Sequence, residues 1–261
     1  MLGGGHGRGC TVGCSLYGDL PHALVEWVTM LIVTREGDRR CKLRPSQRAV
    51  ITPVYLREHT THAKLAAGFW ISEGTAHAYV PSVINILASK APSLTQACAA
   101  RPEFVLVDGT TAECDRVGDH ERDYSGKARR HGVNIQAVTD PAGELIWYSP
   151  ALPGHTVDIT AARTHHIVTT CEPLRIPALA DKAYTEAGGT FQVPCNRHLG
   201  RPLTTRQAAV NRAHAPLRCP VERAFARLKA RRIFRKARIS PNRLTSIAKA
   251  VLTLGTVRKT V

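Results

Sequence analysis

The amino-acid sequence predicts a mixed α/β domain preceded by a small all-helical region. Short apolar runs typical of strands alternate with helical patterns in the last two thirds of the chain, whereas the first third contains helical patterns only. With 261 residues, 43% of them hydrophobic, the chain is long enough for one large and one small domain. We expect an unpatterned, poorly ordered start over residues 1–20, a helical region over 21–96 and the α/β domain over 97–261.

Four helices are expected in the first region. Pro21 suits a first helical turn, and apolar residues at helical spacing continue from it to Val33. Further helices begin near Pro45, after Thr61 and after Ser72, where the hydroxyl side chains can cap the last two. Because these last two helices are short and joined by a tight turn, they match a DNA-binding helix-turn-helix.

A structural bundle of short helices is the alternative to a helix-turn-helix, and on pattern alone it is the commoner case. Three residues also count against a regular DNA-reading helix. Pro53 and Pro81 each remove a hydrogen bond inside a helix, and Gly74 weakens the first turn of the last helix.

Strands and helices are expected to alternate in the α/β region. A connector with a short helix begins at Ala91, and the turn signal at residues 140–143 joins two strands. The expected strands are Phe104–Val107, Val133–Thr139, Leu145–Tyr148, Pro177–Ala180 and Thr190–Val193. The expected helices are Asp158–Val168, one capped by Thr204 or Thr205 that runs to about Ala215, and a final one from Pro220 to Arg231.

The net charge of +16 indicates a polyanionic partner. Residues 201–261 hold 16 Lys and Arg against a single acid, Glu222, and so carry nearly all of this excess. An amphipathic membrane-surface helix would oppose a basic face to a continuous apolar face, and residues 227–238 lack that pattern. Nucleic acid is therefore the favoured partner, with a solvated basic tail as the plain alternative.

Neither membrane insertion nor export is expected. The chain contains no signal-peptide pattern at its N-terminus and no run of about 20 apolar residues. We therefore expect a soluble, cytoplasmic protein that is nucleoid-associated when it acts and has no membrane partner. The eight cysteines are interpreted as thiols, and Cys10 with Cys14 lacks the further Cys or His pair that a zinc site needs.

Two aspartates and one glutamate stand where a metal site could form. Asp108 and Asp181 each follow an apolar strand, and parallel neighbouring strands would present both side chains at the same sheet edge. Glu222 lies in the first turn of a helix among basic residues. Carboxylates that converge on divalent ions are what phosphodiester cleavage requires. The alternatives are a turn or helix cap for each aspartate and an ion-pair partner for Glu222.

Short motifs along the chain match a known family. They are Val107-Asp108-Gly109-Thr110, Tyr124-Ser125-Gly126-Lys127, His131-Gly132-Val133-Asn134, Pro153-Gly154-His155-Thr156-Val157-Asp158, Ala180-Asp181-Lys182-Ala183-Tyr184 and Val221-Glu222-Arg223. On these motifs the chain resembles the DDE transposases of bacterial insertion sequences, particularly the insertion-sequence-five group, over about residues 21–255. The resemblance implies a ribonuclease H-like catalytic core, an N-terminal helix-turn-helix, and a divalent-metal triad of Asp108, Asp181 and Glu222 that uses Mg²⁺ or Mn²⁺, with two ions.

The last motif of that group is Tyr, two residues, Arg, three residues, Glu, six residues, Lys. Arg218, Glu222 and Lys229 fit this spacing, while Ala215 stands at the Tyr position and departs from it. Glu222 and Lys229 share a helix face, so Lys229 could hold a DNA phosphate beside the metal. The candidate DNA-binding residues are Arg218, Lys229, Arg223, Arg227, Lys182 and Lys127, of which Lys127 and Lys182 could equally be solvated surface lysines.

Two further polar positions receive structural interpretations. We expect Asp158 to cap the helix that it begins rather than to take part in catalysis, and His165 and His166 to lie on a helix surface.

The sequence thus predicts a transposase that cleaves DNA and joins it to a target. Its partners would be double-stranded DNA, namely terminal inverted repeats and target DNA, and a homodimer in the DNA complex is compatible with this. One alternative is a nuclease with the same triad and no strand transfer. Another is an inactive DNA-binding relic, suggested by Pro53, Pro81 and Ala215. An RNA-binding protein is disfavoured because only three Trp, six Tyr and five Phe are available to stack on bases.

Overall fold

The structure is a computed structural model, which describes residues 20–37, 40–114, 121–197, 200–234 and 240–260. These residues form two compact units. One extends to Ile86 and includes the chain from Leu254, and the other runs from Leu87 to Thr253. The start predicted to be unpatterned, with Cys10 and Cys14, lies outside the described residues except for Leu20. The domain boundary predicted at residues 96 and 97 stays a prediction.

The first unit contains the helices expected from the sequence, and their caps are confirmed. Thr61 Oγ1 accepts a hydrogen bond from Lys64 N at 3.2 Å, and Ser72 Oγ accepts one from Thr75 N at the same distance. Such caps satisfy backbone donors that the first helical turn leaves unpaired. The helices are α2 (His22–Glu36), α3 (Pro45–Glu58), α4 (His62–Phe69) and α5 (Glu73–Ala88), the last of which runs on into the second unit.

Both suspect prolines lie inside continuous helices, Pro53 in α3 and Pro81 in α5. Tertiary packing compensates for the lost hydrogen bonds, because every α3 residue from Arg48 to Leu56 is buried. The buried guanidinium of Arg48 donates to both carboxylate oxygens of Glu36, at 2.5 and 2.8 Å, and Ser82 Oγ donates to Glu36 at 2.8 Å. This network ties α2, α3 and α5 together.

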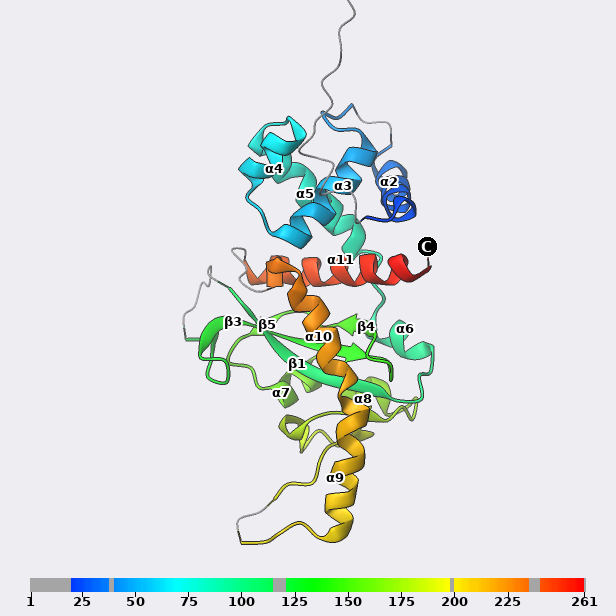
Figure 1. Cartoon of the computed structure of the whole chain (residues 1–261), viewed down its shortest axis with the longest axis vertical. Helices are drawn as coiled ribbons and strands as arrows, with labels where there is room; N and C mark the ends of the chain where they lie inside the picture. Colours follow the sequence, from blue (N-terminus) through cyan, green and yellow to red (C-terminus); the bar gives the residue numbers. More distant parts are fainter. Residues whose placement is uncertain (1–19, 38–39, 115–120, 198–199, 235–239, 261) are drawn as a thin grey trace, which may run out of the picture. The chain divides into compact units, whose positions relative to one another are not determined.

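The second unit is built on one mixed sheet, of which Figure 1 labels β1, β3, β4 and β5. Its strands follow the order β2-β3-β1-β6-β7, with β4 and β5 also paired to β3. β1 and β3 are antiparallel, whereas β6 is parallel to both β1 and β7. This sheet with its helices agrees with the expected ribonuclease H-like α/β fold. The strands are β1 (Val105–Glu113), β2 (Tyr124–Ser125), β3 (Arg130–Thr139), β4 (Leu145–Tyr148), β5 (Leu152–Pro153), β6 (Ala178–Leu179) and β7 (Phe191–Gln192).

The strand expected to end at Asp108 continues instead to Glu113, so that Asp108 lies within β1. The reason is pairing with the long strand β3, whose register holds as far as Glu113 opposite Gly132. The β-branched Thr110 and Thr111 suit this extension.

Helices of the second unit differ from expectation in three places. The helix predicted over Asp158–Val168 is broken, because His166 adopts a left-handed conformation with φ of 57°. The helix predicted to end near Ala215 continues past Pro216, and the helix expected to be the last is followed by another. The observed helices are α6 (Leu94–Ala99), α7 (Asp158–Thr164), α8 (Ile167–Cys171), α9 (Thr205–Arg218), α10 (Pro220–Ala230) and α11 (Pro241–Thr260), with short 3₁₀ turns η1 (Lys182–Tyr184) and η2 (Arg232–Phe234).

A close contact sets the start of α10 against the sheet. Cys219, between α9 and α10, keeps right-handed helical angles, so the two helices follow one another in nearly one line (Figure 1). Gly143, in the turn between β3 and β4, has φ of +79°, and a Cβ built on it would lie 2.4 Å from Pro220 O. Glycine is needed here both for the backbone angle and for the approach of α10.

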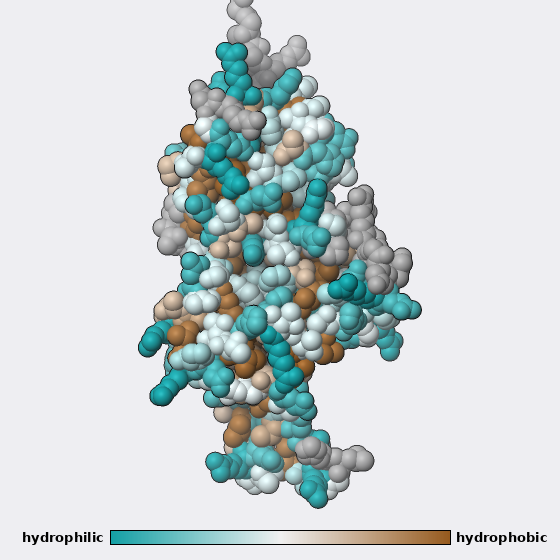
Figure 2. Space-filling view, turned by 180° about the vertical axis from the view of Figure 1, so that it is seen from behind, coloured by the Kyte–Doolittle hydropathy of each residue, from teal (hydrophilic) through white to brown (hydrophobic). Residues whose placement is uncertain are grey.

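Among the described residues, no helix is long and apolar enough to cross a membrane. Figure 2 shows one face on which hydrophobic spots alternate with hydrophilic side chains.

We predict that Gly143→Ala lowers the free energy of unfolding by roughly 1–3 kcal/mol, because the methyl group would meet Pro220 at a positive φ. Gly74→Ala is the matched control, since a Cβ there meets nothing within 4 Å in a helix, and it should stabilise by about 0.5–1 kcal/mol. Urea unfolding of both variants measures the difference. Equal stability of the two would show that the turn and α10 are not in contact.

Candidate active site

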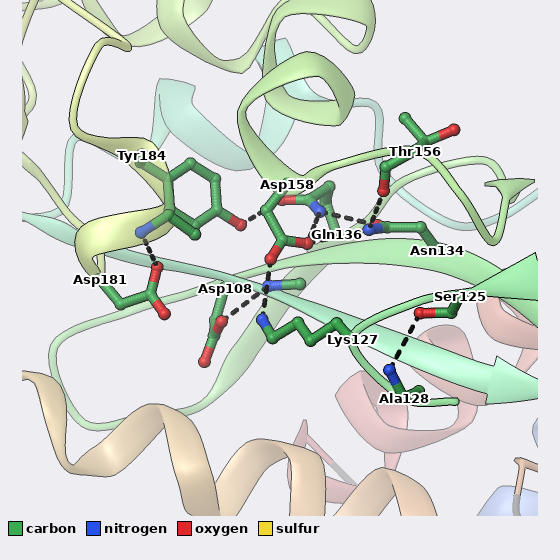
Figure 3. A network of polar contacts seen from close by, with 12 residues as sticks. Asp108, Ser125, Lys127, Ala128, Asn134, Gln136, Thr156, Asp158, Asp181 and Tyr184 are labelled. Atoms are coloured by element: carbon green, nitrogen blue, oxygen red, sulfur yellow. Dashed lines mark hydrogen bonds and ion pairs between the residues drawn. The ribbon is translucent and has the colours of Figure 1, made fainter. Parts of the chain in front are cut away.

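Parallel pairing places the two predicted aspartates at matching positions. Val105 pairs with Ala178 and Leu106 with Leu179, and Asp108 and Asp181 each lie two residues beyond the last pair. The prediction that neighbouring parallel strands carry both aspartates is therefore confirmed, although Asp108 lies inside its strand. Figure 3 shows the two carboxyl groups side by side, and the charge of Asp181 acts on the pKa of Asp108.

Asp108 is buried and is held by two donors. Its Oδ1 accepts a hydrogen bond from Gly109 N at 2.8 Å, and its Oδ2 pairs with Arg218 Nη2 at 2.8 Å. Burial raises the pKa of Asp108 to about 6. Arg218 acts against this shift, while Asp181 and Glu222 add to it. The site thus gathers negative charge around Asp108 with Arg218 as its counter-ion.

Asp181 is fixed by the turn that follows it. Its Oδ1 accepts a hydrogen bond from Ala183 N at 2.9 Å and so caps η1. The other end of this turn is Tyr184, which is buried and whose hydroxyl donates to Gln136 Oε1 at 2.5 Å. The alternative role of Asp181 as a cap and a place in the charged site are therefore both observed.

Glu222 lies exposed in the first turn of α10, a helix that packs on β1. It is near enough for its charge to raise the pKa of Asp108. Nevertheless, in the described parts of the chain no three His, Cys, Asp or Glu side chains are arranged to hold a metal ion. The structure brings the predicted triad into one region without closing it into a cluster.

The donor set nonetheless fits a hard divalent cation, because carboxylate oxygens are the ligands that Mg²⁺ prefers. Arg218 supplies the positive charge next to Asp108, and one of its own nitrogen donors lacks a partner. Its Nε atom is buried without a hydrogen-bond partner among the described residues.

The predicted cations occupy different settings. Arg218 contacts Asp108, and Lys127 Nζ lies 3.0 Å from Asp158 Oδ2. Lys182 and Arg223 are exposed, and Lys229 lies in the cleft that contains Asp181. The side chain of Arg227 lies outside the described residues. Ala215, at the position where a Tyr was expected, is exposed on α9.

An open cleft of about 1130 Å³ lies next to some of these groups, and Asp108, Arg218 and Glu222 are not among its lining residues. Its walls come from the chain after β2, from the segment before α7, from β1 and from α10. The lining residues include Lys127, Asn134, Asp158, Asp181 and Lys229. Carboxylates and lysines therefore face one space.

Sequence reasoning missed a buried polar network beside the aspartates (Figure 3). Asp158 was expected to cap α7, but the N-cap is Val157, and the Asp158 carboxylate instead accepts hydrogen bonds from Asn134, Gln136 and Lys127. The signal was available in β3, where Asn134 and Gln136 alternate with apolar residues of a buried strand. Two amides on one face of such a strand require buried partners.

The histidines expected on a helix surface differ from one another. His166 is exposed, whereas His165 is partly buried with its ring edge-on to Trp147. That expectation is therefore wrong for His165, because Trp147 of β4 covers it.

The first unit presents an exposed aromatic side chain at its tight turn. Trp70 lies between α4 and α5 in a left-handed conformation and is 84% exposed. Together with Lys42 and Thr75, it lines a hollow of about 500 Å³. The apolar side chains of Ala66, Ala67 and Ile71 line the same hollow.

Comparison with known proteins gives matches over both units. The family described as DDE superfamily endonuclease matches residues 107–255, and the helix-turn-helix of DDE superfamily endonuclease matches residues 41–93. The chain is 27% identical over 221 residues to the "Putative transposase for insertion sequence element IS112" of Streptomyces albus G, covering 80% of each chain. No solved structure matches the chain.

We predict that Arg218→Met lowers the free energy of unfolding at pH 8 by roughly 3 kcal/mol, because it leaves the Asp108 carboxylate buried without a counter-ion. Arg212→Met, an exposed position on the same helix, should change it by less than about 0.5 kcal/mol. Urea titration of both variants in EDTA checks this. Similar losses from the two would mean that the Asp108–Arg218 pair does not form in solution.

Proposed function

The chain belongs to the DDE superfamily endonucleases, and we propose that it is an insertion-sequence transposase. In this proposal Asp108, Asp181 and Glu222 form the catalytic site that cuts DNA. The observation that carries this proposal is the register of β1 and β6, which sets two carboxylates beside a cleft lined with lysines. Family membership implies a DNA-cutting enzyme with a DNA-binding helix-turn-helix.

The similarity to the Streptomyces protein supports transposition over simple cleavage, because it extends over 80% of each chain and not over the catalytic unit alone. Assignment to the insertion-sequence-five group stays a prediction from the motifs.

Asp108, Asp181 and Glu222 would hold Mg²⁺ or Mn²⁺, with two ions in the complete site. Such ions, when bound, activate a nucleophile and stabilise charge on the reacting phosphate. The chain's own part is to gather the oxygen ligands and to balance their charge. Arg218 balances the charge of Asp108.

The basic residues would bind the DNA backbone. Lys229 shares the cleft with Asp181, and Arg223 and Lys182 are exposed beside the triad, so phosphates along a strand can meet them in turn. The basic segment after residue 200 then adds affinity that depends on salt and not on sequence. The helix-turn-helix would recognise the terminal repeats, and a homodimer on DNA stays a prediction.

Isosteric neutral variants test the triad. We expect Asp108→Asn, Asp181→Asn and Glu222→Gln each to reduce Mg²⁺- or Mn²⁺-dependent nicking at least about a hundredfold, because each removes a charge that holds the cation. The substrate is a supercoiled plasmid that carries the DNA flanking the coding sequence, and nicked product is measured on gels. DNA binding in EDTA should remain.

Glu103→Gln, an exposed acid outside the cleft, is the control and should cut like the wild type. Full activity of any one triad variant would remove that residue from the site. If the wild-type protein binds this plasmid but never cuts it, the inactive relic becomes the better description.

Strand transfer separates a transposase from a nuclease. We expect a linear donor carrying the element's ends with a 3′-hydroxyl to be joined to a target plasmid, while the same donor with a dideoxy 3′ end is not joined. The reason is that the hydroxyl is the attacking group in the second displacement. Cleavage without joined product from either donor would favour a nuclease.

A further inference from the structure

Asp158 is a buried acidic residue that is not part of the predicted triad and yet lies against it. It is 7% exposed, and its Oδ1 accepts hydrogen bonds from Asn134 Nδ2 at 2.9 Å and Gln136 Nε2 at 3.2 Å. A Cβ added to Gly109, the neighbour of Asp108, would lie 2.0 Å from this same oxygen. The absence of a side chain at position 109 therefore makes room for the Asp158 carboxylate.

The amides that hold Asp158 are themselves oriented. Tyr184 donates its hydroxyl proton to Gln136 Oε1, which turns the Gln136 Nε2 group toward Asp158 and Asn134. Asn134 Nδ2 also donates to Thr156 O at 3.0 Å. A carboxylate fixed by donors that are fixed in turn has a defined direction.

The other oxygen of Asp158 holds a cation that reaches into the cleft. Lys127 Nζ lies 3.0 Å from Asp158 Oδ2 (Figure 3), although the Lys127 side chain is 71% exposed. An exposed ion pair on its own contributes little to stability. Stability therefore does not explain why a buried carboxylate binds an exposed lysine. The position in which Asp158 holds the Lys127 ammonium group explains it better.

That place is next to the catalytic carboxylates. Burial lowers the pKa of Lys127, but its hydrogen bond to Asp158 and the charges of Asp158, Asp181 and Asp108 outweigh this and raise it. Lys127 therefore stays cationic while lying close to both triad aspartates. It follows β2, whose pairing with Arg130 and His131 fixes the loop that carries it.

We propose that Asp158 is a positioning residue that holds Lys127 in the cleft, where the Lys127 ammonium binds the phosphate of the DNA strand being cut. This inference rests on the proposed function, since it assumes that DNA enters the cleft beside Asp108 and Asp181. The network of Asn134, Gln136 and Tyr184 serves this role by orienting Asp158. Asp158 acts through Lys127, because its oxygens are already occupied by protein donors.

A double variant that removes the charges of both Lys127 and Asp158 distinguishes positioning from simple charge balance. The variants are Lys127→Met, Asp158→Asn and the double variant Lys127→Met/Asp158→Asn. The control is Arg101→Met, which removes an exposed cation outside the cleft and outside the helix-turn-helix match. Stability is read from urea midpoints. DNA binding of the full chain to a 30-base-pair duplex is measured in EDTA from 50 to 200 mM salt.

We expect Lys127→Met to lower the urea midpoint, because it leaves a buried carboxylate unpaired, and the double variant to return toward the wild-type midpoint. The slope of log Kd against log salt should fall in magnitude by about 0.9 in Lys127→Met, which corresponds to one lost phosphate contact. Asp158→Asn and the double variant should show the same fall. Arg101→Met should keep both wild-type values.

Two outcomes would overturn the proposal. A double variant with both the wild-type midpoint and the wild-type salt slope would show that the pair only balances charge. A wild-type slope in Asp158→Asn would show that Lys127 does not need Asp158. Because these measurements use no metal and no cleavage, failure of the proposed catalytic function would appear separately, as wild-type protein that does not cut.

Discussion

The parallel pairing of β1 with β6 is the constraint on which the site depends. Two short pairs, Val105 with Ala178 and Leu106 with Leu179, bring together segments more than 70 residues apart. A shift by one residue would turn one aspartate to the opposite face of the sheet. The buried apolar side chains around these strands hold the register, and in this way the hydrophobic core determines the distance between two charged groups.

Collecting carboxylates at a buried sheet edge is unfavourable unless each is compensated. The chain does this in two ways. Asp108 takes Arg218, a cation from the helix that precedes Glu222, whereas Asp158 takes two neutral amides and a lysine. Both carboxylates have a donor on each oxygen, since Gly109 N also donates to Asp108 Oδ1. The side-chain partner of Asp108 is one cation, Arg218, in a place where the charges of Asp181 and Glu222 also act, and a metal ion could replace that cation. Asp158 is instead held by two side-chain amides and a lysine, and we therefore assign Asp108 to cation binding and Asp158 to positioning.

Local signals in the sequence predicted individual elements well where a short-range interaction decides the outcome. Thr61, Ser72 and Thr204 cap the expected helices, and the turn after β3 forms where its Asp-Pro-Ala-Gly sequence indicates. Errors arose where distant pairing decides. β1 extends past Asp108 because β3 is available to pair with it. α11 was not expected, although its buried residues Leu244, Ile247 and Val251 recur at helical spacing.

By itself, the sequence determined the class of fold, the basic character of the last 61 residues and the identity of the three candidate acids, because periodicity, charge and motif spacing are properties of the chain alone. Tertiary structure alone decided that Asp158 faces the cleft and does not cap a helix, that Arg218 pairs with Asp108, and that Gly109 makes room for a carboxylate. These contacts join residues 31 to 110 positions apart, or arise from the close packing of neighbouring strands, and burial makes them necessary. The order of residues along the chain does not show which buried donor will form a hydrogen bond with which acceptor.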